Sequence, residues 1–246
     1  MREKIISIIN QKGGVGKTTS VINLAAGLSL QGKKVLVIDL DPQGNATTGL
    51  GLSNLENSEK SIYSVLNGTK KISEVIEKTK FENLNLITSN VDLSGLEVET
   101  AGDSRRAFLL REQIMAYIND SEGLYSHILI DCPPSLSLLT IMALVASESL
   151  LVPLQTEFFA LEGVTQLVKT IERIKNNLNP SLTIRGILLT MYDKRNKLSG
   201  EVEREARGYF KEKVYKTVIP RNVRLSEAPS HGMPVLFYDK SCPGSK

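Results

Sequence analysis

Residues 5–19, with the sequence IISIINQKGGVGKTT, decide the fold of this chain. An apolar run of strand length, Ile5 to Ile9, leads through a glycine-rich loop into a helix that begins at Lys17. Glycines let such a loop curl so that successive backbone N–H groups face one phosphate, at the positive end of the helix. A glycine-rich turn can also be mere packing, but the order of strand, glycines, lysine, threonine and helix favours a phosphate-binding loop.

Two lysines stand in this loop. Lys17 is expected to reach the β- and γ-phosphates of a nucleotide, and the Thr18 hydroxyl to bind Mg²⁺. The usual spacing has a glycine where this chain has Gln11, and an additional lysine, Lys12, follows it. Lys12 is either a solvated loop residue or a catalytic one, because a positive charge can offset the charge that develops in phosphoryl transfer. The predicted nucleotide-binding residues of the loop are Lys12, Gly13, Gly14, Val15, Gly16, Lys17, Thr18 and Thr19.

Outside the loop, strand-length apolar runs alternate with amphipathic stretches of helix length. This alternation predicts parallel strands joined by right-handed crossovers, and the near-continuous apolar runs predict a sheet covered on both faces. The segment 45–83 is less regular and is predicted to be surface decoration. The expected strands are Ile5–Ile9, Val35–Asp39, Leu84–Thr88, Ile128–Asp131, Ser149–Leu154 and Ile184–Thr190. The expected helices are Lys17–Leu30, Arg105–Ile118, Leu136–Ala146, Leu161–Leu178 and Gly200–Lys213.

Composition agrees with one domain. The chain has 246 residues, of which 41% are hydrophobic and 23% charged, and a formal net charge of +3. We therefore predict a single-domain α/β P-loop NTPase over residues 1–246, with a mostly parallel twisted sheet and helices on both faces. Two distant cysteines give no disulfide framework or metal cluster, and no apolar run reaches the length of a membrane span, so the expected location is the cytosol.

Acidic side chains end two of the predicted strands. Asp39 and Asp41 close the second strand on the same side of an extended chain, where carboxylates suit a site for Mg²⁺, water and phosphate. Asp131 closes the strand Ile128–Asp131 and is expected to hold Mg²⁺ through water. Asp39 and Asp41 could also be exposed turn residues before Pro42, and Asp131 could be only a helix cap; the phosphate loop favours the metal site for all three.

The loop KGGVGKTT is a deviant Walker A motif, and here the chain resembles the ParA/MinD superfamily. Three further stretches resemble the ParA (Soj-type) branch: IDLDPQGNATTGLG at 38–51, DCPPSLS at 131–137 and VIPRNVRLSEAPSHGMP at 218–234. The resemblance implies that Lys12 crosses a sandwich dimer to the nucleotide of the other subunit. It also implies that Asp41 orients the attacking water, that Asp39 supports the metal shell, and that Pro220 and Asn222 contact the adenine. Pro220 is alternatively a residue that only ends an edge strand. Catalytic roles are thus expected for Lys12, Lys17 and Asp41.

A basic stretch lies near the end of the chain. Thr190 to Arg224 contains ten Lys and Arg against five Asp and Glu, whereas the remainder is slightly acidic. Such a stretch suits salt-sensitive binding to phosphate backbones, or it is a solvated helix face with Glu–Lys pairs. The resemblance favours DNA contacts by Arg195, Arg221 and Arg224.

Together these features predict an ATP-dependent dimerising switch, with ATP and Mg²⁺ as ligands, slow intrinsic hydrolysis and a nucleoid-associated cytoplasmic location. The expected partners are a second copy of the chain, nonspecific double-stranded DNA and a ParB-like protein that stimulates hydrolysis, for a chromosome or a plasmid. A MinD-like membrane positioner is the alternative, but it needs a basic amphipathic helix that residues 239–246 do not offer. An iron–sulfur relative would need more cysteines, and a small-molecule kinase an acceptor site. In the family a final helix follows the sequence GSK of 244–246, so that helix is expected to be absent here.

Overall fold

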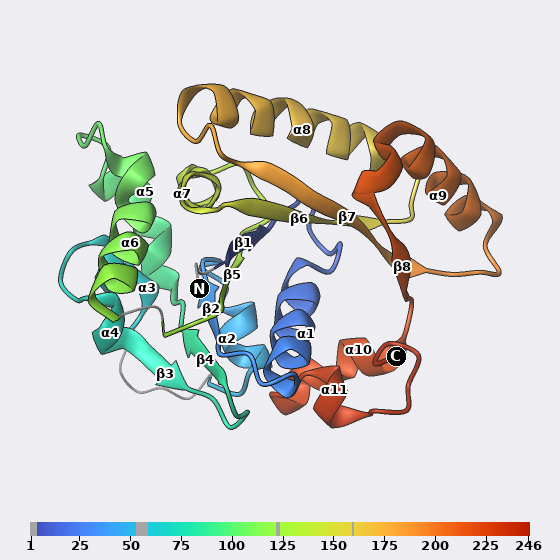
Figure 1. The fold of residues 1–246 in the computed structure, drawn as a ribbon, viewed down its shortest axis with the longest axis horizontal. Coiled ribbons are helices and arrows are strands. Elements are labelled where there is room, and N and C mark those ends of the chain that lie inside the picture. The colour runs from blue at the N-terminus through green and yellow to red at the C-terminus, as the bar shows by residue number, and fades with distance from the viewer. Residues whose placement is uncertain (1–3, 53–58, 122–123, 159) are drawn as a thin grey trace.

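A twisted sheet forms the centre of the computed structural model, which describes residues 4–52, 59–121, 124–158 and 160–246 (Figure 1). Within these residues the sheet has eight strands in the order β3-β4-β2-β5-β1-β6-β7-β8. All neighbouring strands are parallel except β3 and β4, so the predicted mostly parallel sheet is confirmed. The strands are β1 (Lys4–Ile8), β2 (Val35–Asp39), β3 (Ile76–Lys78), β4 (Leu84–Ile87), β5 (His127–Asp131), β6 (Ser149–Gln155), β7 (Thr183–Tyr192) and β8 (Val214–Pro220).

Helices cover both faces of this sheet, as predicted (Figure 1). The helices of eight or more residues are α1 (Lys17–Leu30), α6 (Leu109–Ser121), α7 (Leu138–Ala146), α8 (Ala160–Asn177) and α9 (Lys197–Phe210). The shorter ones are α2 (Asn45–Gly49), α3 (Ile62–Leu66), α4 (Ile72–Val75), α5 (Leu96–Glu99), α10 (Val223–Glu227) and α11 (Val235–Tyr238). Single 3₁₀ turns are η1 (Val91–Gly95), η2 (Arg106–Phe108), η3 (Lys211–Lys213) and η4 (Ala228–His231).

Alternation along the buried strands divides the core between the two faces. Val35 and Val37 of β2 pack in a cluster with α1, whereas Leu36 and Ile38 pack in a second cluster with α6 and α7. A third cluster joins α8 and α9 to β6 and β7. Because β2 contributes to both faces, its side chains are apolar without interruption until Asp39, as a doubly covered parallel strand requires.

The segment 45–83 differs from the prediction. Residues 53–58 lie outside the described residues, but α3 and α4 bury Ile62, Val65 and Val75 completely in the core beside α6. The prediction of surface decoration is therefore wrong for this part. Its apolar residues are few and are spread over single helical turns, so the sequence shows no long amphipathic period that would reveal their burial.

Two strands were not predicted. β3 is a short, antiparallel edge strand, and β8 is the other edge, where Lys216 and Thr217 are exposed. An edge strand with exposed polar residues lacks the apolar run by which the six other strands were predicted. No helix within the described residues is long and apolar enough to cross a bilayer.

Candidate functional site

The glycine-rich loop joins the carboxyl end of β1 to the amino end of α1. Gly14 and Gly16 adopt left-handed backbone conformations, with φ of 73° and 88°, which an L side chain rarely adopts. Gly16 is the residue before the first turn of α1, and no side chain caps that helix end. The N–H groups of the first turn therefore keep their capacity to bind an anion, and the positive end of the helix dipole favours one.

Lys17 lies inside this loop. Its side chain is buried, with 6% of the residue exposed, and its ammonium group donates a hydrogen bond to the Lys12 carbonyl oxygen at 3.0 Å. Burial lowers the pKa of Lys17, against the opposing charges of Asp131 and Asp41. A buried ammonium group that faces carboxylates and spans its own loop is placed to bind phosphate oxygens.

Three carboxylates lie at or just beyond the carboxyl ends of β2 and β5, and two of them, Asp41 and Asp131, act on the charge of Lys17. β5 lies between β1 and β2, and Asp131 pairs with both Ile8 and Asp39 in the strand register. Asp39 and Asp131 are fully buried, and Asp41 is 7% exposed. The structure therefore brings together the acidic residues and the phosphate loop that the sequence placed on separate strands.

Protein donors surround the Asp39 carboxylate. One oxygen accepts hydrogen bonds from the backbone N–H and the hydroxyl of Thr47, at 2.8 and 2.7 Å, and the other accepts from the Asp41 N–H at 3.2 Å. Burial raises the pKa of Asp39 to about 6, although the hydrogen bonds from Thr47 favour the charged form. Asp39 thus anchors the start of α2 and the backbone of Asp41, and its support of a metal shell stays a prediction.

The Asp131 carboxylate is different, because neither of its oxygens has a hydrogen bond of ordinary geometry. Burial and the neighbouring Asp39 raise its pKa well above the usual range, and the nearby Thr18 hydroxyl acts in the opposite direction. A buried carboxylate without a partner costs free energy unless a cation compensates it. Mg²⁺ binds carboxylate and hydroxyl oxygens, and it usually fills its remaining positions with water and phosphate oxygens. Thr18 and Asp131 therefore fit this ion.

A cavity of about 440 Å³ opens over the loop. Asp41 lies in its wall, and one of its oxygens accepts a hydrogen bond from the Gln43 N–H at 3.0 Å. The predicted Gly13, Gly14, Gly16, Lys17, Thr18 and Thr19 also line the cavity. The rest of the lining was not predicted from the sequence: Asn45, Thr48, Gly49, Pro134, Met191, Pro229 and Ser230. All of these except Met191 lie in the three stretches that carry the family resemblance, so those stretches were the signal that could have revealed them.

Lys12 lies outside this cavity, on the rim of the loop. About 46% of its side chain is exposed, and its ammonium group forms an ion pair with Glu157. Gln155 donates a hydrogen bond to the second oxygen of Glu157, so three side chains form a small network after β6. The two loop lysines therefore occupy different environments, one buried beneath the phosphate site and one accessible to a second molecule.

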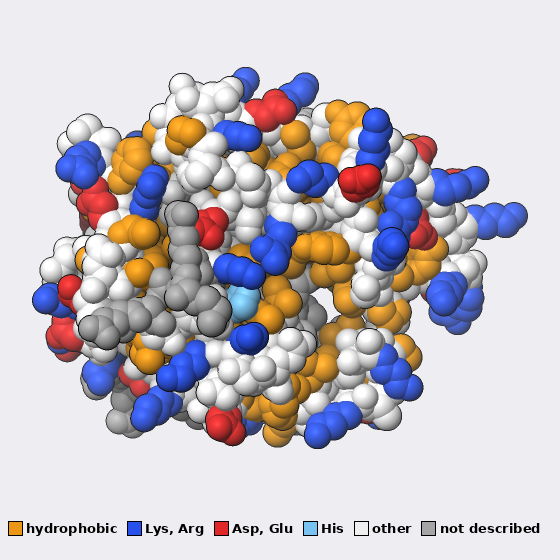
Figure 2. Space-filling model, viewed as in Figure 1, with side chains coloured by type: hydrophobic (Ala, Val, Ile, Leu, Met, Phe, Trp, Pro, Cys, Tyr) orange, Lys and Arg blue, Asp and Glu red, His pale blue; other side chains and the backbone are white. Residues whose placement is uncertain are grey.

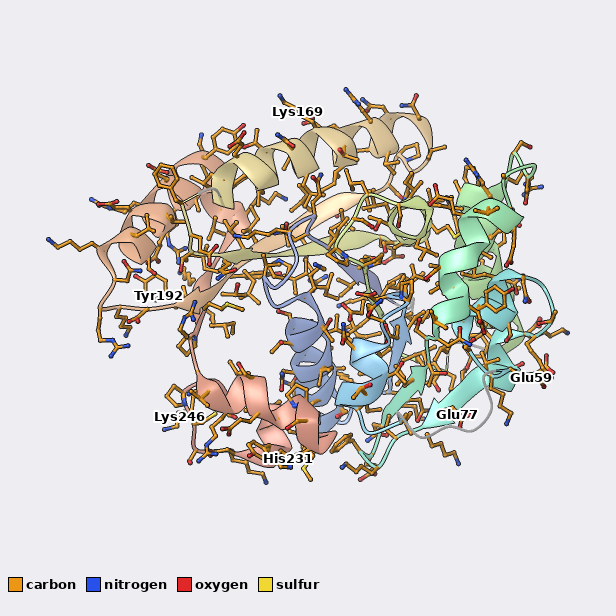
Figure 3. All side chains as sticks on the ribbon, turned by 180° about the vertical axis from the view of Figure 1, so that it is seen from behind. Glu59, Glu77, Lys169, Tyr192, His231 and Lys246 are labelled. Carbon is orange, nitrogen blue, oxygen red and sulfur yellow. The ribbon has the colours of Figure 1, made fainter. Side chains whose placement is uncertain are left out.

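Pro220 and Asn222 do not line this cavity. The Asn222 side-chain oxygen accepts a hydrogen bond from the Arg224 N–H at 2.9 Å and caps α10. Pro220 lines a second hollow of about 520 Å³ together with Tyr192, Arg195 and Arg221. Tyr192 marks the carboxyl end of β7 in the reverse view of Figure 3. The adenine contacts of Pro220 and Asn222 stay predictions.

The three predicted DNA-binding arginines are exposed, but two of them are paired. Arg195 donates two hydrogen bonds to Asp193, at 3.1 and 3.0 Å, and Arg224 contacts Glu227 at 2.9 Å and Asp239 at 3.6 Å. Arg221 has no ion pair with another described residue. Figure 2 shows Lys and Arg side chains gathered over the end of the molecule that carries α9.

Comparison with known proteins assigns this chain to a family. A family model described as "AAA domain" matches residues 3–184. The chain is 50% identical over 243 residues to the chromosome partitioning protein ParA of Caulobacter vibrioides, covering 99% of this chain and 90% of that protein. It is 48% identical to the sporulation initiation inhibitor protein Soj of Bacillus subtilis, covering 99% and 94%.

The chain belongs to the ParA family of chromosome-partitioning ATPases. It is an α/β P-loop protein with the ATPase activity of that family. A solved structure of a different enzyme shares the fold: cobyrinic acid a,c-diamide synthase from Mycobacterium smegmatis with a bound ATP analogue and magnesium. That protein is 35% identical, with a TM-score of 0.82, and the match covers 90% of this chain and 86% of that one. The greater identity to ParA and Soj over nearly the whole chain decides the family.

Proposed function

We propose that this ParA-family ATPase is an ATP-dependent dimerising switch for segregating a chromosome or plasmid. The ATP-bound dimer binds double-stranded DNA without sequence preference, and a ParB-like partner stimulates hydrolysis and release. The observation that carries the proposal is the contrast between the two loop lysines. Lys17 is buried under the phosphate site, whereas Lys12 stands half-exposed at its rim, where it can serve a nucleotide held by a second copy of the chain.

ATP is the proposed substrate of the cavity over the loop. Its β- and γ-phosphates would contact the N–H groups between Gly13 and Thr19, with the Lys17 ammonium group transferring from the Lys12 carbonyl to phosphate oxygens. The Thr18 hydroxyl and, through water, Asp131 would hold Mg²⁺, which supplies positive charge against the phosphates. In a P-loop site of this kind, catalysis depends on positioning and charge more than on covalent chemistry.

Asp41 would orient the water that attacks the γ-phosphorus. The bond from that phosphorus to the bridging oxygen breaks, ADP leaves with the electron pair, and the proton of the water is released with phosphate. No arginine lines the cavity among the described residues, so the charge that develops in this step would be offset by Mg²⁺, by Lys17 and, in the dimer, by the Lys12 side chain of the second copy. Slow intrinsic hydrolysis is the expected result, and a partner that completes the site would accelerate it.

The DNA-binding part of the proposal rests on the basic stretch from β7 to α10. This stretch carries ten Lys and Arg against five Asp and Glu, with Arg195, Arg221 and Arg224 as the contacting residues. Two copies joined by ATP would present twice as many phosphate contacts to one duplex, so two weak surfaces would act as one stronger site. Such a protein would lie on the nucleoid in the cytoplasm.

Three variants test the ATP switch. Lys17→Ala should lose ATP affinity in calorimetry, because its ammonium group is the buried cation of the phosphate site. Asp41→Ala should bind ATP and accumulate dimers, since only water positioning is lost, and Lys12→Ala should bind ATP and remain monomeric. Sedimentation with ATP that shows the same monomer–dimer balance for the last two variants would refute the separate roles of Asp41 and Lys12.

A further inference from the structure

A buried hydroxyl group in β7 forms a hydrogen bond to the backbone of the phosphate loop. Thr190 in β7 donates a hydrogen bond from its side chain to the carbonyl oxygen of Val15 at 2.9 Å. Val15 is 1% exposed and Thr190 is 3% exposed, so water does not compete for this contact. Thr190 lies far from the loop in sequence and outside every motif that identified the site.

This contact determines which way one peptide group of the loop faces. The peptide bond between Val15 and Gly16 is trans, so its carbonyl oxygen and its N–H point in opposite directions. Because Thr190 binds the carbonyl on the side of β7, the N–H of Gly16 faces the other side, where Gly16 lines the cavity. Glycine at φ 88° has no strong backbone preference of its own, so an outside contact is needed to select this orientation.

Thr190 is a rigid anchor because of its place in the sheet. β7 lies between β6 and β8, and Thr190 pairs with Gln155 of β6. The next residue, Met191, has a left-handed φ of 51° and also lines the cavity. In a regular strand successive side chains point to opposite faces, so the unusual backbone at Met191 lets Thr190 contact the loop while the next residue lines the cavity.

We propose that Thr190 is a positioning residue for nucleotide binding. Its hydroxyl holds the Val15–Gly16 peptide so that the Gly16 N–H meets a phosphate oxygen without prior rearrangement. The proposal rests on the ATP site described above and extends it to a residue outside the loop. It concerns the hydroxyl group alone, because the Thr190 methyl group is not close enough to constrain Gly16: even a Cβ added to Gly16 would lie 3.9 Å from it.

The test compares substitutions that separate the hydroxyl from the methyl group. Calorimetry with MgADP and MgATP should give about tenfold weaker binding for Thr190→Val, the scale of one lost hydrogen bond. Thr190→Ser keeps the hydroxyl and should bind within about twofold of the unchanged chain. The matched control is Thr88→Val, because Thr88 is 5% exposed, its hydroxyl donates to the Lys60 carbonyl at 2.9 Å, and neither residue belongs to the loop or to the cavity lining. That control should lose a similar amount of thermal stability but no nucleotide affinity.

Two outcomes would show that the Thr190 hydroxyl does not position the loop. Equal affinity of Thr190→Val and the unchanged chain would overturn the proposal, as would binding by Thr190→Ser that is as weak as that of the valine variant. If Thr190→Val does not fold, Thr190→Ala compared with Thr190→Ser gives the same contrast. An unchanged chain that binds neither nucleotide would refute the ATP site itself, and this inference with it.

Discussion

At the scale of single residues, Asp131 is the buried carboxylate whose charge the described residues compensate least. Its carboxylate is fully buried, has no hydrogen bond of ordinary geometry, and lies beside the charged groups of Asp39 and Lys17. A protein interior tolerates such a group when a ligand compensates it. The nucleotide-free chain therefore carries a cost that Mg²⁺ and nucleotide would relieve, which links ligand binding to folding stability.

Asp131→Asn should stabilise the nucleotide-free protein while weakening MgADP binding. The folded-state pKa of Asp131 is raised, so its ionised form opposes folding at neutral pH, and the amide lacks that charge. We expect an increase of about 1 kcal/mol or more, or roughly 2–4 °C in Tm. The gain should shrink as the pH falls toward the ordinary carboxyl pKa, where the proton neutralises Asp131 in both states.

Thermal melts with and without MgADP check this, with Asp120→Asn, an exposed position on α6, as the control that should change nothing. A lower Tm for nucleotide-free Asp131→Asn would show that the carboxylate has a stabilising partner, contrary to this account.

The Lys12–Glu157 ion pair gives a second residue-scale prediction. Lys12 cannot serve another subunit while it is bound to Glu157, so Glu157→Gln should tighten ATP-dependent dimerisation. The pair is about half-exposed, so the gain should be at most about fivefold and should shrink at high salt. Sedimentation equilibrium with ATP measures it, and Glu162→Gln, exposed on α8, is the control. Weaker dimerisation of Glu157→Gln would mean that Glu157 instead holds Lys12 in its working position.

At the scale of elements, the basic stretch is not uniform, because local carboxylates neutralise part of it. Asp193 pairs with Arg195, and Glu227 and Asp239 pair with Arg224, whereas no described carboxylate pairs with Arg221. A paired arginine must exchange a carboxylate for a phosphate when DNA binds, so its net contribution is smaller. The distribution of carboxylates therefore ranks the three arginines.

Arg221→Ala should weaken duplex binding more than Arg195→Ala or Arg224→Ala, for every sequence alike and with ATP affinity unchanged. Asp193→Asn should strengthen binding, since it frees Arg195. Fluorescence anisotropy with the ATP-bound protein measures these affinities. The control is Arg111→Ala, an exposed position on α6, which lies at the other end of the molecule (Figure 1). If all three arginine variants bind DNA as tightly as the unchanged chain does, the basic stretch is a solvated helix face instead.

The elements that could be predicted from the sequence are those with a local signal, either an apolar run or a motif of fixed spacing. Six strands, the phosphate loop and the carboxylates at the strand ends followed from apolar runs and motif spacing. β8 was missed because an exposed edge strand with Lys216 has no apolar run, and the burial of α3 was missed because one helical turn shows no period. The contact of Thr190 with Val15 and the isolation of Asp131 depend on strand register, which pattern does not reveal.

At the scale of the whole molecule, the nucleotide site and the basic stretch share one framework. The phosphate loop follows β1, and the stretch begins at the end of β7, two strands away in the same sheet. β7 both supports the loop through Thr190 and leads to Arg195, so a change in the loop has a direct structural connection to the basic surface. Dimerisation through Lys12 would then determine how many such surfaces meet one DNA.

The central claim is that ATP controls DNA binding, and a duplex-binding series over salt tests it most directly. Binding is measured with ATP, ADP or no nucleotide, using Asp41→Ala to preserve the ATP state. If each subunit contacts about three phosphates, the ATP dimer contacts about six, and its affinity should fall roughly a thousandfold between about 50 and 200 mM salt. The ADP-bound and nucleotide-free chains should bind only weakly at any salt in this range. Equally tight binding with ADP, or binding that salt leaves unchanged, would contradict the account.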